Sequence, residues 1–420
     1  MDGRTKKHWA IWLNNQSDTG AVIAQLLKGR GSSSFLLPPG GRGALFSKLE
    51  LDRLVDEEDR HDKNIITPGT TQSLVSMSSG EQKKALLEHI LRSRPDFVIL
   101  DNPFDNLDAA SQSRLRGMLQ SLCQRVAIVQ LMSRQQDLLP FIDNFASIDG
   151  PKLIRHQDLT AFQAVLDAAR RDPVFAGPIP PPLTPLQAAG PELISLQNVS
   201  VSFAGRTVLR DINWTINSGE FWQLTGKNGS GKTTLLTMIT GDSSKGYGQE
   251  LYIFGQKKGS GESVWEIKRK MGYFTPAMTA KFTRRHSVEF MLLSGLYDSV
   301  GLYTQPTMAQ RNLARDWLKL IGMWQLKDSC FTGLSMGQQR LLMVTRAMIK
   351  HPLLLILDEP TVGLDDASAA LFVALVNKIA REGTSAIIFV SHRQEPGLKP
   401  RFTYELAMTQ TGSTGTAIRH

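Results

Sequence analysis

Hydrophobic and polar positions follow the same order twice along the chain. In residues 80–108, and again in residues 337–365, a stretch with helical periodicity stops at a proline. A short, continuous apolar run follows and ends in an aspartate. The two stretches of 29 residues align without a gap and are identical at nine positions. An ungapped internal match of this kind predicts a tandem duplication of one helix–strand unit.

The second half of the chain alternates short apolar runs with helical patterns. One run, FWQLT at 221–225, leads through a glycine-rich turn into a helix, and another, SAIIFVS at 385–391, follows the helical pattern LFVALVNKIA. Uninterrupted apolar strands are typical of parallel sheets that helices cover on both faces. The pattern therefore predicts an α/β fold.

A proline-rich segment separates the two copies. Residues 173–191 hold seven prolines, which cannot donate to a regular hydrogen-bond ladder and favour an extended conformation. We therefore predict a first domain over residues 1–167, a semi-rigid linker over 168–191 and a second domain over 192–420. The alternative is a long proline-rich loop inside a single domain.

Composition excludes several classes of protein. The 420 residues are 41% hydrophobic, which is enough for more than one core and argues against a disordered chain. No stretch approaches 18 uninterrupted apolar residues, so we expect no transmembrane segment. Cys123 and Cys330 are the only cysteines, which argues against a disulfide scaffold and favours a cytoplasmic location.

The net charge of +9 is unevenly distributed. Residues 191–420 carry 26 basic and 18 acidic residues, and residues 257–285 alone carry eight basic and two acidic ones. We interpret this run as a solvated face that attracts phosphate groups, and nucleic acid is not an expected partner. Contact with anionic lipid headgroups or RNA remains the alternative. We expect the aromatic residues within the run, Trp265, Tyr273 and Phe274, to lie in the core.

The strongest chemical signal is a phosphate-binding loop. Residues 226–233 read GKNGSGKT, which matches G-x-x-x-x-G-K-[ST] between a strand and a helix. Glycines let backbone N–H groups turn toward phosphate oxygens at a helix N-terminus, while Lys232 supplies a charge and the Thr233 hydroxyl can ligate Mg²⁺. The predicted nucleotide-binding residues of this loop are Gly226, Asn228, Gly229, Ser230, Gly231, Lys232, Thr233 and Thr234.

Two further motifs follow the loop. Asp358 and Glu359 end the apolar run LLLILDEP, where Asp358 can hold Mg²⁺ and Glu359 can act as the general base for an attacking water. An acidic pair after a strand can also be an ordinary strand end. Met77 and Leu334 each open a Ser-x-Gly motif before a helix, and each lies 24 residues before its unit's aspartate. By itself, Ser-x-Gly is usually only a helix cap.

Together these motifs resemble the ATP-binding cassette (ABC) ATPases, over nearly the whole chain. The resemblance implies two P-loop nucleotide-binding domains in tandem, with ATP and Mg²⁺ as ligands. It implies that Phe203 stacks on adenine, that His392 is the switch histidine, and that Asp108 and Asp365 lie in D-loops. Such cassettes pair head-to-tail, so Ser78 and Gly80 would complete the partner cassette's site. Residues 241–274 are similar, more narrowly, to double-cassette molybdate-transport ATP-binding proteins, also called photorepair proteins.

The first copy departs from the family's pattern. Aligned on Trp9 and Trp222, its loop reads LNNQSDTG, which places Thr19 at the position of Lys232. An unrelated N-terminal segment is the alternative. Asn102 replaces the catalytic glutamate, and the alignment places Arg134 at the switch histidine.

Conversely, the second copy's own Ser-x-Gly motif has Met336 where the family has glycine. Both sets of changes fall on one composite site. We therefore predict one competent ATP site, with Lys232, Glu359 and His392 as its catalytic residues, and one degenerate site.

Two other departures concern partners. Pro276 stands where the family has a glutamine that senses the γ-phosphate, and the first copy is 44 residues shorter between its loop and its Ser-x-Gly motif. We expect most of these residues to be missing from the helical part that docks on membrane subunits. The resemblance implies a separately encoded permease, which would hold the protein at the inner face of a membrane. The alternatives are a non-transport ABC ATPase acting in stress repair or on ribosomes, and a nucleotide-dependent interaction module.

Overall fold

The computed structural model describes residues 7–28, 40–61, 66, 73–74, 77–150, 152–169, 175–282 and 286–420. The first six residues of the predicted first domain, Pro173 of the predicted linker and residues 283–285 of the basic run lie outside these ranges. The chain forms two compact units. The first comprises Met1–Arg171 with the short segment Gly363–Ala367, and the second comprises the remaining residues.

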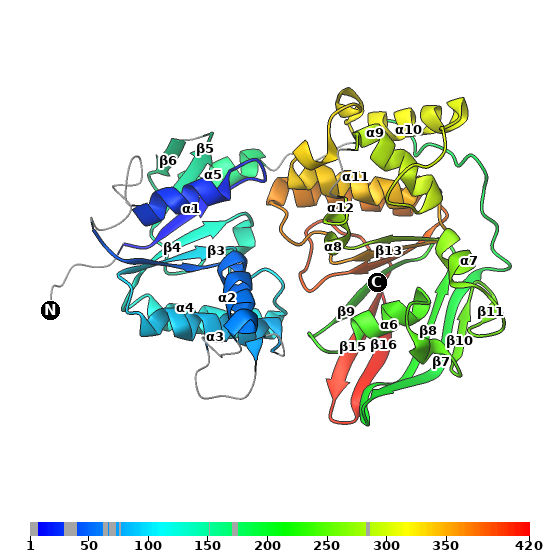
Figure 1. Ribbon diagram of the computed structural model, residues 1–420, viewed down its shortest axis with the longest axis horizontal. Coiled ribbons are helices and arrows are strands. Elements are labelled where there is room, and N and C mark those ends of the chain that lie inside the picture. Colours follow the sequence, from blue (N-terminus) through cyan, green and yellow to red (C-terminus); the bar gives the residue numbers. More distant parts are fainter. Residues whose placement is uncertain are drawn as a thin grey trace. The chain divides into compact units, whose positions relative to one another are not determined.

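The first unit is an α/β domain around a six-stranded sheet. Its elements are β1 (Trp9–Trp12), α1 (Thr19–Lys28), β2 (Gly43–Phe46), α2 (Lys48–His61), α3 (Ser79–Arg92), β3 (Phe97–Asp101), α4 (Ala109–Leu122), β4 (Ala127–Met132), β5 (Asn144–Asp149), β6 (Lys152–His156) and α5 (Leu159–Ala169). The strand order is β2-β3-β4-β1-β5-β6, and all neighbours are parallel except β5 and β6. Helix α1 covers one face of the sheet, and α3 and α4 cover the other (Figure 1).

The second unit contains more strands and helices. They are β7 (Glu192–Phe203), β8 (Arg206–Asn217), β9 (Phe221–Gly226), α6 (Lys232–Ile239), β10 (Glu250–Ile253), β11 (Gln256–Lys257), α7 (Val264–Arg269), β12 (Met271–Phe274), α8 (Pro276–Thr279), α9 (Val288–Leu293), α10 (Met308–Leu320), α11 (Met336–Met348), β13 (Leu354–Asp358), α12 (Asp366–Glu382), β14 (Ala386–Val390), β15 (Phe402–Thr409) and β16 (Gly412–Arg419).

The sheet of the second unit includes six strands that are arranged like the six strands of the first unit. Its order is β11-β10-β7-β8-β16-β15-β9-β14-β13-β12, and the six strands β12-β13-β14-β9-β15-β16 repeat the order and directions of the first unit. The remaining four strands form an antiparallel extension that joins at β8 and β16. Among the described residues of the first unit, no strands correspond to this extension.

Strand register fixes which residues of the two units are equivalent. Ile11 lies opposite Leu131 in the first sheet, and Leu224 lies opposite Val390 in the second. If Ile11 is matched with Leu224, Trp9 takes the position of Trp222, as the sequence alignment predicts. The alternative that residues 13–20 belong to an unrelated N-terminal segment is therefore excluded. On the same count Thr19 takes the place of Lys232, and both residues open a helix.

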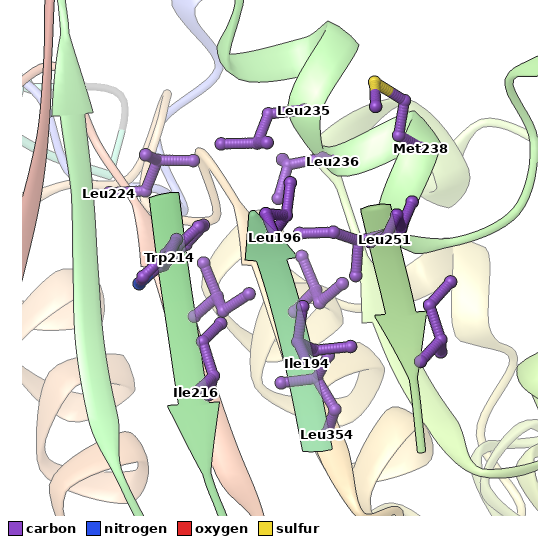
Figure 2. Close-up of a cluster of buried hydrophobic side chains, with 14 of the residues drawn as sticks. Ile194, Leu196, Trp214, Ile216, Leu224, Leu235, Leu236, Met238, Leu251 and Leu354 are labelled. Atoms are coloured by element: carbon purple, nitrogen blue, oxygen red, sulfur yellow. The ribbon is translucent and has the colours of Figure 1, made fainter. Parts of the chain in front are cut away.

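A continuous apolar core holds the P-loop helix of the second unit against its sheet. Leucines of α6 point toward β7, β8 and β10, where Leu196, Trp214 and Leu251 are all at most 3% exposed (Figure 2). Burial of aliphatic side chains contributes about 1.5–3 kcal/mol each, so this cluster anchors the helix that follows the phosphate-binding loop.

The proline-rich segment packs along the second unit. The N–H of Ile179 donates to Glu382 of α12 at 3.2 Å, and Leu186 and Ala188 pack against the core that Figure 2 shows. Helix α5 ends at Ala169, two residues inside the predicted linker.

Candidate nucleotide-binding and hydrolysis site

The phosphate-binding loop joins β9 to α6 and requires glycine at two positions. Gly226 has φ +149°, and a Cβ there would lie 2.6 Å from Ser230 Oγ. Gly231 caps α6 with φ +92°, and a Cβ there would lie 2.6 Å from a methyl carbon of Leu209. Side chains avoid both conformations and both spaces, so the loop backbone is exposed to a ligand only with glycine at these positions.

Lys232 is the first residue of α6 and is only 8% exposed. Its ammonium group donates hydrogen bonds to the carbonyl oxygens of Gly226 at 2.7 Å and Lys227 at 3.1 Å. The charge is thereby held inside the curve of the loop, beside the positive end of the helix. This arrangement suits the binding of an anion.

The rest of the loop also fits a nucleotide phosphate chain with Mg²⁺. The Ser230 side chain is fully buried, and its hydroxyl has no hydrogen-bond partner among the described residues. Thr233 is exposed, and Asn228 and Thr234 are half-buried. A Mg²⁺ ion would be held by the hard oxygen ligands that it prefers, which here are the Thr233 hydroxyl, Asp358 and oxygens of the bound phosphate.

The acidic pair lies at the end of β13. Asp358 accepts a hydrogen bond from the Tyr273 hydroxyl at 3.3 Å. Burial raises the pKa of Asp358 above its usual value, and the charge of Glu359 raises it further, whereas Tyr273, Lys232 and His392 oppose the shift. Glu359 follows Asp358 directly and contacts His392, so the acidic pair and the histidine lie in one site.

Glu359 has an unusual backbone conformation and a defined partner. Its φ is +50°, its N–H donates to the Val390 carbonyl at 3.0 Å, and its Oε1 lies 2.5 Å from Nε2 of His392. The His392 side chain is 9% exposed, while that of Glu359 is 25% exposed. The carboxylate is thus oriented by the histidine and is still reachable by water.

Phe203 lies at the tip of the β7–β8 hairpin. It pairs with Arg206, and Leu209 of the same hairpin contacts the loop at Gly231. The ring is 44% exposed and available for stacking. The ammonium of Lys245 lies 5.2 Å from its centroid, a neighbour that no motif in the sequence indicated.

The first unit has the same framework with different chemistry. Asn102 has φ +41° and donates its N–H to the Leu131 carbonyl at 3.1 Å, as Glu359 does to Val390. The Asn102 Oδ1 accepts hydrogen bonds from the N–H of Ser133 at 3.2 Å and from its hydroxyl at 3.0 Å. An asparagine and a serine therefore replace the glutamate and the histidine.

This geometry corrects the placement of Arg134 at the switch position. Leu131 lies opposite Asp101, as Val390 lies opposite Asp358. His392 is two residues after Val390, and the residue two positions after Leu131 is Ser133. The predicted switch position, Arg134, is therefore wrong by one residue.

Ser78, Gly80 and Asp108, which we expect the first unit to contribute to the ATP site of the partner cassette, lie close together. Ser78 caps α3 and forms a reciprocal capping box with Glu81. A Cβ on Gly80 would lie 2.9 Å from Ser111 Oγ, and the N–H of Ser111 donates to the Asp108 carboxylate at 2.7 Å. Ser78, Gly80 and Ser111 also line a hollow of about 680 Å³.

In the second unit, Ser335 caps α11 with the same kind of box. Met336 follows it with its side chain 44% exposed. A flexible thioether therefore projects where the first unit has Ser79.

The three aromatic residues of the basic run differ in their exposure to solvent. Phe274 is fully buried, as expected, and Tyr273 is half-buried with its hydroxyl on Asp358. Trp265 on α7 is 75% exposed, so its expected core position is wrong. Its neighbour Ile267 supplies the buried contact of this one-and-a-half-turn helix.

Most of the 44-residue difference between the units lies in the helical segment that precedes each Ser-x-Gly motif. Gly43 is followed by 34 positions up to Met77, whereas Met271 is followed by 63 positions up to Leu334. Helices α9 and α10 lie in this interval of the second unit (Figure 1). Pro276 is the first residue of α8, and its carbonyl accepts a hydrogen bond from Arg340 at 3.0 Å.

The fold and the site define a P-loop ATPase with two cassettes, the first of which is shortened. The ABC transporter family model matches residues 209–362. The chain is 37% identical over 329 residues to the ABC transporter ATP-binding protein ModF of Escherichia coli, covering 76% of this chain and 67% of that protein. It is 31% identical over 332 residues to an uncharacterized ABC transporter ATP-binding protein of Schizosaccharomyces pombe, covering 77% and 66% of the two chains.

A solved structure shares the fold over almost the whole length. The archaeal ribosome recycling factor aABCE1, crystallised with the ribosomal stalk protein aP1, superposes with a TM-score of 0.62 and 14% identity, covering 99% of this chain and 86% of that one. On the family model and the 37% identity to ModF, the chain belongs to the ABC family of ATP-binding proteins. None of the helices in the described ranges is both long enough and apolar enough to cross a bilayer.

Proposed function

We propose that the second cassette hydrolyses ATP and that the first does not. The observation that carries this proposal is the 2.5 Å contact between His392 and Glu359, which an asparagine and a serine replace in the first unit. Glu359 accepts a proton from the water that attacks the γ-phosphate, and His392 orients it. Lys232 neutralises part of the charge that develops on the phosphate, and Thr233 and Asp358 would hold a Mg²⁺ ion that would supply further positive charge there.

We further propose that the first cassette contributes Ser78, Gly80 and Asp108 to the same ATP site. The support is that each unit keeps the residues that the other lacks. The first unit keeps Ser78, Gly80 and Asp108 but has no lysine at the position of Lys232. The second unit keeps the lysine but carries the exposed Met336 in its own motif. The rival arrangement is pairing between the second cassettes of two chains, which would rely on Ser335 instead.

A matched pair of variants separates these arrangements. Ser78 and Ser335 both cap a helix in a capping box, so Ser78→Ala and Ser335→Ala carry a similar stability cost of about 1 kcal/mol. We expect Ser78→Ala to lower the ATP turnover of the full chain more than tenfold and Ser335→Ala to leave it within twofold. The opposite result would contradict the intramolecular arrangement and support pairing between chains.

For the wider role, we propose an ATP-hydrolysing subunit that acts with a separately encoded transmembrane protein in the transport of molybdate or another solute. The support is the transporter family and the likeness to ModF. Such a subunit would lie in the cytoplasm, at the inner face of a membrane. Mild solubilisation of membranes should then co-purify a membrane protein with this chain.

A second candidate is a non-transport ABC ATPase. Pro276 in place of the glutamine that senses the γ-phosphate, and the shortened helical part of the first unit, favour it. Cell fractionation distinguishes the two: a membrane pellet supports transport, and a ribosomal or soluble fraction supports the second candidate.

A further inference from the structure

We propose that the second unit has a separate binding pocket for a small organic anion. The pocket is a hollow of about 530 Å³ between α12 and the segment that leads into β15. Phe175 of the proline-rich segment supplies partly exposed aromatic surface, and Phe221, the first residue of β9, lines the hollow with only 3% of its surface exposed. A volume of this size is in the range of small-molecule sites.

The pocket lies away from the phosphate-binding loop. Phe221 and Gly226 are the two ends of β9, so about 16 Å of strand separates the pocket from the loop at 3.3 Å per residue. The pocket is at the amino ends of the parallel strands, whereas ATP-binding residues follow their carboxyl ends. A ligand there would be additional to the nucleotide.

The lining carries an excess of positive charge. Lys378, Arg381, Lys399 and Arg401 all contribute to it. The nearby carboxylate of Glu382 accepts hydrogen bonds from Lys378 at 2.8 Å and Arg381 at 3.0 Å.

Hydrogen bonds from Lys378, then from Arg381 and the Ile179 N–H, lower the pKa of Glu382, so this carboxylate is ionised and already partnered. Lys399 and Arg401, by contrast, form no ion pair within the part of the chain that the structure describes. They are exposed, so their charge is available to a ligand from solution.

The wall that bears these two cations is fixed to its neighbours. The N–H of Lys399 donates to the Asn377 side chain at 3.1 Å, and Asn377 donates to the Gly397 carbonyl at 2.8 Å. The N–H of Arg401 donates to the Phe221 carbonyl at 2.9 Å. The backbone that carries the two charged side chains is therefore fixed at the rim of a preformed hollow, which reduces the entropy cost of binding.

This combination selects the ligand's chemistry. A phosphate or carboxylate head can pair with Lys399 and Arg401, while a flat apolar body fills the space beside Phe175 and Phe221. Inorganic phosphate would use only the rim, and a neutral ring would use only the aromatic surface. Because Phe175 belongs to the segment that leads out of the first unit, an occupant would hold this segment against α12.

Calorimetric titration of the full chain, saturated with Mg²⁺ and ADP to fill the nucleotide site, tests the proposal. The probes are phenyl phosphate, inorganic phosphate and benzyl alcohol. We expect phenyl phosphate to bind at least tenfold more tightly than either of the other two. Equal affinity for phenyl phosphate and inorganic phosphate would overturn the pocket and indicate nonspecific charge attraction.

Variants locate the binding. We expect Lys399→Ala with Arg401→Ala to weaken phenyl phosphate binding more than tenfold, and Phe175→Ala about fivefold. The charge-preserving pair Lys399→Arg and Arg401→Lys should retain it. The control is Arg315→Ala with Lys319→Ala on α10, which removes two charges elsewhere. Binding that survives the first double variant, or that the control removes, would overturn the assignment, whatever the outcome of the ATPase experiments.

Discussion

His392 contacts the carboxylate of Glu359 through Nε2 at 2.5 Å, in a site where Glu359 is held in a left-handed backbone conformation. We predict that Glu359→Gln lowers ATP turnover about 100- to 10,000-fold, because an amide cannot accept the water's proton. ATP affinity should remain within a few fold, since the phosphate-binding loop is unchanged. Phosphate release and equilibrium nucleotide binding measure the two quantities. The matched control is Asn102→Gln in the first unit, which should leave turnover unchanged.

His392→Ala should reduce turnover less than Glu359→Gln. A hydrogen bond to a charged group contributes about 1.5–3 kcal/mol, which corresponds to about a 10- to 100-fold change in rate. Ser133→Ala removes the equivalent contact in the first unit and should have no effect on turnover. Wild-type turnover in the histidine variant would exclude an orienting role for His392.

Gly231→Ala should abolish ATP binding. The new methyl group would collide with Leu209 and would require φ +92° from an alanine. Gly205→Ala is the control, because Gly205 has φ +80° at a hairpin tip but has open space around it. We expect the control to lose about 1–2 kcal/mol of stability and to keep nucleotide affinity. Thermal unfolding and nucleotide titration of both variants check this.

A buried ion pair stabilises the loop after β11. Lys258 and Glu262 approach to 3.2 Å with side chains 0% and 5% exposed. Burial opposes the charge of Glu262, but backbone N–H groups and Lys258 outweigh it and lower its pKa to about 2. The unfolded value is about 4.3. The stabilisation is therefore complete above that pH and declines as the pH falls toward 2.

Glu262→Gln should accordingly destabilise the second unit by about 3 kcal/mol at pH 7, because it leaves the Lys258 charge buried without its counter-charge. The exposed pair of Lys257 and Glu250, with side chains 44% and 49% exposed, provides the control: Glu250→Gln should cost less than about 1 kcal/mol. Denaturant unfolding at pH 7 and pH 3 measures both variants. Equal costs for the two variants at pH 7 would contradict the assignment.

The sequence predicted the framework of the site well because its motifs are tied to strand ends. Trp9 and Trp222 are equivalent, as the local sequence pattern predicts, and Asp358 ends a buried strand that Glu359 directly follows. The switch position was misplaced by one residue because the register between β3 and β4, which places Ser133 there, depends on pairing between strands and not on a local pattern.

Other features depend on contacts between distant segments. Trp265 lies on a short helix whose buried face is set by Ile267, which an aromatic pattern alone does not reveal. Likewise, seven prolines predict an extended segment but do not indicate that Ile179 binds Glu382. Tertiary packing decides these positions, and a single sequence does not contain that information in local form.

The strand register between the units has an experimental consequence. Thr19, Asn102 and Ser133 take the places of Lys232, Glu359 and His392, so the first unit differs from the second at these three positions on the same arrangement of six strands. Introducing those three residues into the second unit would give a chain in which both halves carry the same residues at these positions. Any cellular function that such a chain retains would depend on its folded structure and not on ATP hydrolysis.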